Sequence, residues 1–176
     1  MHDKYNPLTS LLAHRSDRDY LIGELIGELN AGHTYVASGD MEQVKRVETG
    51  LLGCELSARG DFYRIDAIFP GANWDPALRS PLTESGVDVK AGEYLVSIDG
   101  APLRTNMNPY RLLEGKAGKR VTLGISAGPS EKDARDVTVT PVASELPLLH
   151  YRWVERNRDL VDSLSGGRVG YIYVPN

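Results

Sequence analysis

Apolar residues recur with two different periods along the chain, and the change of period separates a central part from two flanks. Between residues 16 and 29 they return every three or four positions, which predicts an amphipathic helix. The apolar residues of this predicted helix are Leu21, Ile22, Leu25, Ile26 and Leu29. Ser16, followed three residues later by Asp19, has the spacing of a capping box and indicates where the helix begins.

The predicted helix ends immediately before a histidine. Asn30-Ala31-Gly32 interrupts the helical pattern, and Gly32 is expected to adopt the left-handed conformation that closes many helices. His33 is therefore expected at a helix exit. Residues 33–37 (HTYVA) are expected to form a short strand that leaves it.

From residue 44 to residue 143 the pattern becomes that of short strands joined by turns. Residues 51–57 and 61–69 are predicted as a hairpin that turns at Ala58-Arg59-Gly60. Another predicted strand ends at the turn dipeptide Asp99-Gly100. The last two predicted strands, residues 120–126 and 135–141, alternate apolar and polar positions.

Two further segments complete this central part. Asn108 as N-cap and Pro109 at the first helical position predict a short helix that ends near Gly115 or Gly118. Residues 70–81 form a Gly- and Pro-rich loop of unusual length. Its Trp74 is expected either to anchor the loop by packing or to contact another part of the protein. Short strands with one short helix predict a small, partly open β-barrel.

After Pro147 the helical period returns, with Leu149, Trp153, Leu160 and Leu164 on one face. A turn at residues 165–167 leads into an apolar segment, residues 169–174, that is predicted as a strand. Because a single terminal strand normally pairs with another strand, the chain is interpreted as a piece of a larger protein.

The fold class is therefore predicted as α+β, in three parts. Residues 1–43 provide a helix and strand of a core domain, and residues 44–143 form the β-module. Residues 144–176 provide a helix and the first strand of the following core domain.

Composition excludes several classes of function. Apolar residues make up 41% of the chain and charged residues 25%, which is typical of a globular protein. The 20 Lys and Arg residues and the 24 Asp and Glu residues are mixed along the whole length, so nucleic acid is not an expected partner. The longest apolar runs are far shorter than the ~20 residues of a membrane span, so no membrane is expected either. The start of the chain lacks the apolar region of a signal peptide. His2, His14 and His150 lack metal-ligand spacing, so no metal and no cofactor is expected.

Three segments of the central part resemble, in order, the segments of the PDZ domain of bacterial proteases: TGLLGCELSARGDFYRIDAIFPG, SPLTESGVDVKAGEYLVSIDGAPL and PYRLLEGKAGKRVTLGIS. A helix-then-histidine segment precedes that domain in tail-specific and tricorn-like serine peptidases, and it is similar to YLIGELIGELNAGHTYV here. The segment that follows it in tricorn-like members is similar to WVERNRDLVDSLSGGRVGYIYVPN. The chain thus resembles the part of a tricorn-like serine peptidase that spans the PDZ domain and its flanking core segments.

The resemblance implies a large cytoplasmic peptidase that assembles into rings and whose core is interrupted by the PDZ domain. His33 matches the catalytic base of the family. Some members carry a serine immediately before this histidine, where this chain has Gly32, so no auxiliary side chain is expected there. The nucleophilic serine is expected beyond residue 176, and the 176 residues alone are therefore expected to be inactive.

Serine peptidase chemistry requires a base, a group that orients the base, and donors for the oxyanion. Histidine suits the role of base because imidazole ordinarily titrates near pH ~6.5. Ser38 is the nearest serine to His33 in sequence, but Gly39-Asp40 beside it marks a turn more simply than a nucleophile. Two alternatives stay open. The chain could be a non-catalytic peptide-binding or scaffolding module in which His33 only packs, or an inactive relative that has lost the chemistry.

The resemblance also implies a peptide-binding groove. Backbone N–H groups of Leu52, Gly53 and Cys54 would bind the terminal carboxylate of a peptide that adds to the sheet as a strand. Tyr110 and Leu113 would form the opposite wall. Peptide substrates or peptide C-termini are thus expected partners, together with other domains and subunits of the parent peptidase.

Cys54 is then a small apolar residue of this groove, since no Lys, Arg or His stands beside it to lower its pKa. The alternative is that the module keeps its barrel with a filled groove, because the 70–81 loop could cover it.

Overall fold

In the computed structural model the chain divides into two compact units, residues 1–46 and residues 47–176, and each is described by itself. The structure describes residues 2–37, 39 and 44–175. Within the described residues, none of the helices combines the length and the apolar character that crossing a bilayer requires.

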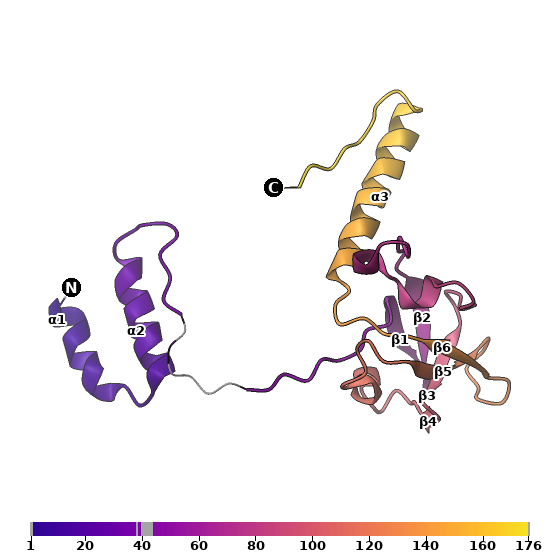
Figure 1. Cartoon of the computed structure of the whole chain (residues 1–176), viewed down its shortest axis with the longest axis horizontal. Coiled ribbons are helices and arrows are strands. Elements are labelled where there is room, and N and C mark those ends of the chain that lie inside the picture. The colour runs from indigo at the N-terminus through magenta and orange to yellow at the C-terminus, as the bar shows by residue number, and fades with distance from the viewer. Residues whose placement is uncertain (1, 38, 40–43, 176) are drawn as a thin grey trace. The chain divides into compact units, whose positions relative to one another are not determined.

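The first unit is a helical hairpin in which α1 (His2–Tyr5) and the 3₁₀-helix η1 (Asn6–Leu11) lie beside α2 (Arg15–Gly27), as Figure 1 shows. Tyr5 holds the two arms together. Its buried hydroxyl donates to Glu28 Oε1 at 2.8 Å and to the Glu24 carbonyl at 3.2 Å, and Lys4 also bonds to Glu28. The sequence pattern did not predict the first arm, because its short, mixed residues carry no helical repeat.

The predicted helix α2 is confirmed, but its N-cap is His14, two residues earlier than the Ser16 that the capping pattern indicated. Asp17, not Asp19, caps it: the Asp17 carboxylate accepts from the N–H groups of Ala13 at 3.0 Å and His14 at 3.3 Å. Asp19 instead pairs with Arg15 one turn away, at 3.1 Å. The carboxylate at the helix start satisfies N–H groups that would otherwise have no partner.

The exit from α2 differs from the prediction. Asn30, with φ of 48°, takes the left-handed conformation that was expected of Gly32. Asparagine tolerates this conformation better than most residues, so a glycine is not required. The expected strand at residues 33–37 is also wrong: these residues form no strand, since no other strand lies in the described part of this unit to pair with them.

The second unit is built on an antiparallel sheet with strand order β1-β2-β3-β5-β6, while β4 pairs with β3. The strands are β1 (Cys54–Arg59), β2 (Phe62–Ile68), β3 (Tyr94–Ile98), β4 (Ala101–Pro102), β5 (Val121–Ser126) and β6 (Arg135–Val139). Leu51 and Val142 exchange two backbone hydrogen bonds of 2.8 and 2.9 Å, which join the chain before β1 to the chain after β6. The sheet therefore curls into the partly open barrel of the predicted α+β class.

The turns and the core follow the sequence pattern. Gly60 (φ 59°) closes the β1–β2 hairpin, and Asp99 (φ 49°) with Gly100 (φ 76°) closes the β3–β4 turn, as such two-residue turns require. The short helix predicted after Asn108 is the 3₁₀-helix η4 (Pro109–Leu113), capped by the Asn108 side chain. The interior is aliphatic; its fully buried members include Leu95, Leu103, Leu113, Leu123 and Ile125.

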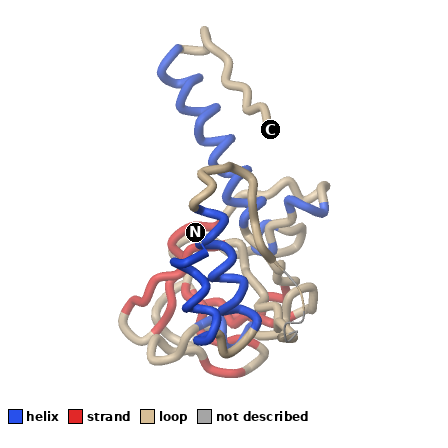
Figure 2. Tube along the Cα trace, turned by 90° about the vertical axis from the view of Figure 1, so that its left-hand side faces the viewer, coloured by secondary structure: helices blue, strands red, loops and turns tan. Residues whose placement is uncertain are grey.

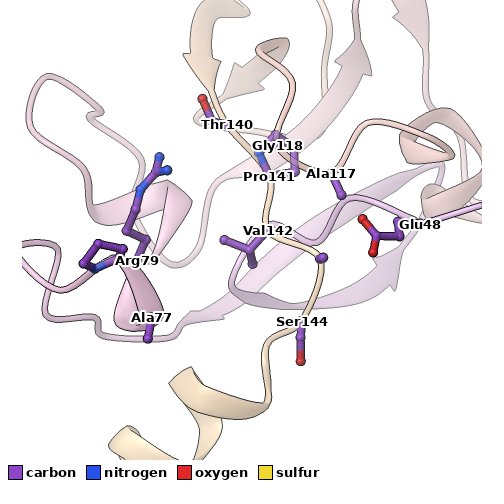
Figure 3. A pocket seen from close by; sticks show the side chains of 11 residues that line it. Glu48, Ala77, Arg79, Ala117, Gly118, Thr140, Pro141, Val142 and Ser144 are labelled. Atoms are coloured by element: carbon purple, nitrogen blue, oxygen red, sulfur yellow. The ribbon is translucent and has the colours of Figure 1, made fainter.

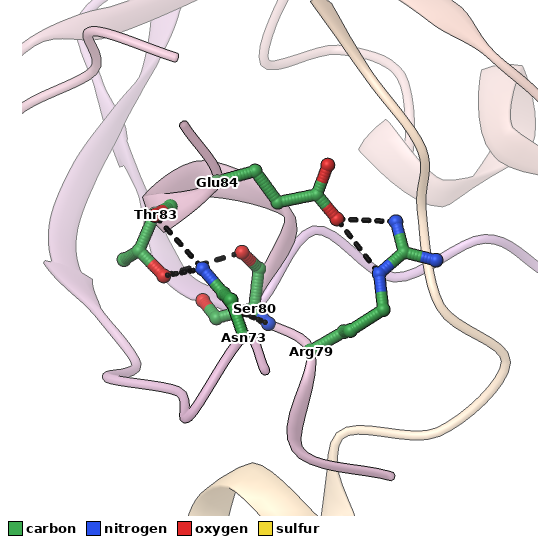
Figure 4. A network of polar contacts seen from close by, with 5 residues as sticks. All are labelled: Asn73, Arg79, Ser80, Thr83 and Glu84. Carbon is green, nitrogen blue, oxygen red and sulfur yellow. Dashed lines mark hydrogen bonds and ion pairs between the residues drawn. The ribbon is translucent and has the colours of Figure 1, made fainter. Parts of the chain in front are cut away.

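The long loop after β2 is organised by its own side chains (Figure 4). It contains two 3₁₀-turns, η2 (Pro76–Leu78) and η3 (Pro81–Thr83). Asn73 links them: its Oδ1 accepts from the Ser80 N–H at 2.8 Å, and its Nδ2 donates to the Thr83 carbonyl at 2.8 Å. Buried Ser80 donates through Oγ to the Phe69 carbonyl at 2.6 Å, so the loop is also tied to the end of β2.

Helix α3 (Leu146–Ser165) projects from the barrel, and the chain after it runs back along the helix (Figures 1 and 2). The predicted apolar face is exposed over much of its length, with Leu164 78% exposed. The predicted strand at residues 169–174 is wrong, because the segment is extended without a strand partner. It packs on α3 instead: the Tyr173 ring meets those of His150 at 4.7 Å and Trp153 at 5.6 Å.

Gly71 lies at the tightest point of the ordered loop, which provides a test of that order. A Cβ at this position would lie 2.5 Å from the Leu78 carbonyl oxygen and 2.8 Å from Ser80 Cβ. We expect Gly71→Ala to lower the free energy of unfolding by about 1–3 kcal/mol, because backbone atoms must move to admit the methyl group. Urea denaturation measures this free energy.

Gly128→Ala is the matched control, since a Cβ at Gly128 would have no heavy atom within 4 Å. Its effect should stay within about 0.5 kcal/mol. Equal effects of the two substitutions would contradict the close packing of this loop.

Candidate carboxylate-binding turn and candidate general base

The chain enters β1 through a turn at Gly53 that is closely packed on three sides. Gly53 has φ of 74°, in the left-handed region that favours glycine. A Cβ here would lie 3.2 Å from both Ser80 Oγ and Pro81 Cδ and 3.4 Å from Leu148 Cδ1. The Gly53 carbonyl accepts from the Phe69 N–H at 2.7 Å. The backbone is thus held so that the Gly53 N–H points out of the sheet.

The partner of this N–H is a carboxylate from the same chain. Glu145 Oε1 accepts from the Gly53 N–H at 2.6 Å. Burial raises the pKa of the Glu145 carboxyl above its usual range, and hydrogen bonds from the backbone N–H groups of Gly53 and Cys54 partly offset that effect. The turn therefore binds a carboxylate through the Gly53 amide, and the neighbouring Cys54 amide adds to the stabilisation of its charge.

Glu145 stands at the N-cap of α3, but its side chain does not cap the helix. Leu148, in the first turn of α3, is only 1% exposed and packs next to Gly53. The first turn of α3 thus brings a carboxylate and an aliphatic side chain together at the Gly53 turn. Sequence reasoning missed both residues, because an acidic residue before a helix is ordinarily explained as a cap or by the helix dipole.

The residues predicted for the groove lie around this carboxylate in two different ways. The side chains of Leu52 (3% exposed), Cys54 (5%) and Leu113 (0%) belong to the aliphatic core, so Leu113 presents no open wall. Tyr110 is 37% exposed, and its pKa is raised by burial and by the nearby carboxylate of Glu145. Of the residues predicted for the groove, Gly53 thus contacts this carboxylate through its backbone amide, and the Tyr110 hydroxyl is near enough to be influenced by its charge.

The 70–81 loop borders the turn but supplies no plug for it. Ser80 and Pro81 at its end pack against Gly53. Trp74 is 85% exposed, so the expectation that it anchors the loop by packing is wrong. The turn is thus occupied, but by the Glu145 carboxylate at the start of α3 and not by the 70–81 loop, as the sequence had suggested.

A second contact holds α3 against the edge of β1. Arg152 Nη1 donates to Glu55 Oε1 at 2.7 Å, and the Arg152 guanidinium lies over the Phe69 ring, 5.4 Å from its centroid. Both side chains of the ion pair are more than a third exposed. An exposed ion pair of this kind contributes only about 0–1 kcal/mol to stability, so it adds little to the attachment of α3.

The connection between β6 and α3 runs past an open pocket of about 350 Å³ (Figure 3). Thr140, Pro141, Val142 and Ser144 line one side, and Ala77 and Arg79 of the long loop line the other. Arg79 is already paired with Glu84. None of the predicted site residues lines this pocket. The pocket leaves open space beside the chain segment that leads into Glu145.

His33 lies in the first unit, six residues after the end of α2 at Gly27, so the expectation that it sits directly at the helix exit is wrong. It is exposed and has φ of 60°, a conformation that few residues other than glycine adopt. Such backbone outliers cluster at functional sites. The His33 ring makes no hydrogen bond or ion pair with another described residue. Ser38, the nearest serine in sequence, lies outside the described residues.

No group of three or more His, Cys, Asp and Glu residues that could hold a metal ion is found in residues 2–37, 39 and 44–175. The candidate chemistry of the described chain therefore rests on the Gly53 turn and on the imidazole of His33.

Comparison with known proteins places the β-module and both flanks in one context. Residues 50–144 match the family described as the tricorn protease PDZ domain. Tricorn protease homolog 1 of Streptomyces coelicolor is 39% identical over 177 residues, covering 99% of this chain and 16% of that protein. The tricorn protease of Thermoplasma acidophilum is 29% identical over 100% of the chain.

A crystal structure of the tricorn protease superimposes with a TM-score of 0.84 at 31% identity, covering 99% of this chain and 17% of that one. The chain therefore spans about a sixth of the length of the relatives it matches.

Cys54 provides a test of the packing behind the Gly53 turn. Burial, with the carboxylates of Glu145 and Glu55, raises the pKa of the Cys54 thiol to about 12. At pH 8 we expect alkylation by iodoacetamide to be at least about 100-fold slower than in urea-unfolded chain, because only the thiolate reacts and the sulfur is covered. Mass spectrometry follows the single cysteine without ambiguity, and labelling at the unfolded rate would contradict the buried position.

Proposed function

The chain belongs to the tricorn protease PDZ domain family, and from this premise we propose that it serves a larger serine peptidase in two ways. It contributes His33 as the general base, and its PDZ domain handles peptide substrates or the assembly of the enzyme. The nucleophilic serine and the oxyanion donors would come from other parts of the parent protein, since the chain spans only about a sixth of its relatives. The 176 residues alone are accordingly expected to be inactive.

The observation that carries the role of His33 is its exposed side chain on a left-handed backbone, in the segment that follows α2. A general base must reach a hydroxyl within hydrogen-bonding distance, so its ring has to be free of other described partners and accessible. The segment that carries His33 follows directly from α2, which ends at Gly27. A histidine that only packed would be covered, whereas this ring is not.

The observation that supports the peptide-handling role is the carboxylate at the Gly53 turn. PDZ domains bind peptide C-termini through backbone amides at such a turn, while the peptide adds to the sheet edge as a strand. Here the amides of Gly53 and Cys54 already hold a carboxylate, that of Glu145. Strand β1 pairs only with β2 among the described strands, so an added strand would take its other edge, where Arg152 of α3 now contacts Glu55.

The test of the base is the peptidase kcat of the full parent protein with His33 replaced. We expect His33→Asn to lower kcat by about 10³- to 10⁶-fold, as loss of the base does in a serine triad. Asparagine is chosen because it tolerates the left-handed backbone, so the substitution removes the imidazole and keeps the turn. Circular dichroism should be unchanged.

His2→Ala is the control, since the His2 side chain is 81% exposed and pairs only with its neighbour Asp3. It should leave kcat within about twofold. A fall of less than about tenfold for His33→Asn would remove His33 from the chemistry and leave a non-catalytic peptide-binding module as the function of the chain.

A further inference from the structure

The occupied turn at Gly53 has the chemistry of a PDZ domain that already holds a ligand. A peptide C-terminus presents a free carboxylate next to one side chain. At this turn Glu145 supplies the carboxylate, 2.6 Å from the Gly53 nitrogen, and Leu148 supplies an aliphatic side chain that is 1% exposed and packs beside Gly53. Both groups come from the start of helix α3. They therefore imitate the carboxylate and the last side chain of a bound peptide, but not its added strand.

The side chain of Glu145 does not serve its own helix. As the N-cap residue of α3 it could accept from the free N–H groups of the first turn, but it makes no such bond. Its carboxylate is directed to the sheet, at the cost of partial burial. A buried charge is favourable only where its hydrogen bonds outweigh the loss of water, so this contact is finely balanced.

The remaining contacts allow the first turn of α3 to move. Ala143 and Ser144, which join the barrel to Glu145, are exposed, and the open pocket of Figure 3 lies beside them. The Arg152–Glu55 pair is largely exposed and therefore weak. Further along α3 the apolar face is exposed, with Leu160 at 52%. The contacts of α3 described here thus lie in its first two turns, at Glu145, Leu148 and Arg152.

We propose that Glu145 is an internal ligand of the Gly53 turn, which closes the PDZ domain, and that a peptide C-terminus binds only by displacing it. The competing ligand is a peptide with a free terminal carboxylate and an aliphatic last side chain, because those groups match what Glu145 and Leu148 place there. This inference rests on the proposed peptide-handling role of the domain. Binding would release the start of α3, so occupation of the groove and the position of the helix are coupled.

The test is the affinity of the 176-residue chain for a fluorescein-labelled peptide that ends in valine, measured by fluorescence anisotropy. We expect Glu145→Ala to bind this peptide at least about tenfold more tightly than the original chain, because the competing carboxylate is gone. Glu145→Gln, which keeps an oxygen acceptor without the charge, should lie between the two. The same peptide with an amidated C-terminus should bind all three chains weakly.

Two controls separate the competition from its alternatives. Glu155→Ala removes one negative charge from α3 at a residue that pairs with Arg158, so it tests whether net charge alone changes affinity; it should behave as the original chain. In the absence of peptide, Glu145→Ala should shift the amide resonances of Gly53 and Cys54 in ¹H–¹⁵N spectra, and peptide should restore much of that shift. These spectra also report whether the variant folds.

The outcomes are distinct. Tighter binding by Glu145→Ala but not by Glu155→Ala supports the internal ligand. Equal affinity of the original chain and Glu145→Ala overturns it and leaves the peptide-handling role intact. No binding by any folded variant overturns that role as well, and makes the Glu145 contact purely structural.

Discussion

The hydrogen bond from the Gly53 amide to the Glu145 carboxylate joins three segments that are far apart in sequence. The turn before β1, the end of the long loop at Ser80 and Pro81, and the first turn of α3 all meet at this point. A buried N–H must find a partner, and a left-handed turn directs this one away from the sheet. Any group that satisfies it has to come from outside the barrel. In this chain the partner is Glu145, the N-cap residue of α3.

Helix α3 contacts the rest of its unit through its first two turns, at Glu145, Leu148 and Arg152. Glu145 and Leu148 are engaged with the barrel, whereas Leu160 and Leu164 further along are mostly exposed. The energetic terms at Glu145 oppose one another, since burial disfavours the charge and two amides favour it. A contact of this type holds an element in place without the large apolar area that would make the attachment permanent. The long loop, by contrast, is fixed by hydrogen bonds from Asn73 and Ser80 within itself and to β2.

The two candidate functions place different demands on the backbone. A carboxylate-binding turn needs amides that converge on one point, and Gly53 provides this because it can adopt positive φ without strain. The candidate base needs a side chain that is exposed to its substrate. His33 is exposed, and its backbone lies in the same left-handed region as that of Gly53, although a residue with a Cβ adopts this region less readily than glycine. A histidine held there stores a modest strain, of order 1–3 kcal/mol, that the preceding helix has to sustain.

Local sequence was sufficient to predict those elements that depend only on neighbouring residues. The period of apolar residues located α2, the strands and α3, and Gly60, Asp99 and Asn108 marked turns and a cap, because the backbone geometry there depends on the residue itself. The resemblance to tricorn-like peptidases also followed from the printed residues. The expected strands at residues 33–37 and 169–174 failed because a strand exists only when a second strand pairs with it. Gly32 as the helix cap failed because α2 already ends at Gly27, and Asn30 takes the left-handed conformation in the turn that follows.

The occupant of the Gly53 turn was decided by tertiary structure alone. Glu145 is separated from Gly53 by the whole barrel in sequence, and no pattern around either residue indicates the other. Only the closure of the sheet, through the paired Leu51 and Val142, brings the end of β6 and the start of α3 to the turn before β1. The resemblance seen in the sequence thus indicated which amides could bind a carboxylate. Which carboxylate they bind depended on the path of the chain through the folded barrel.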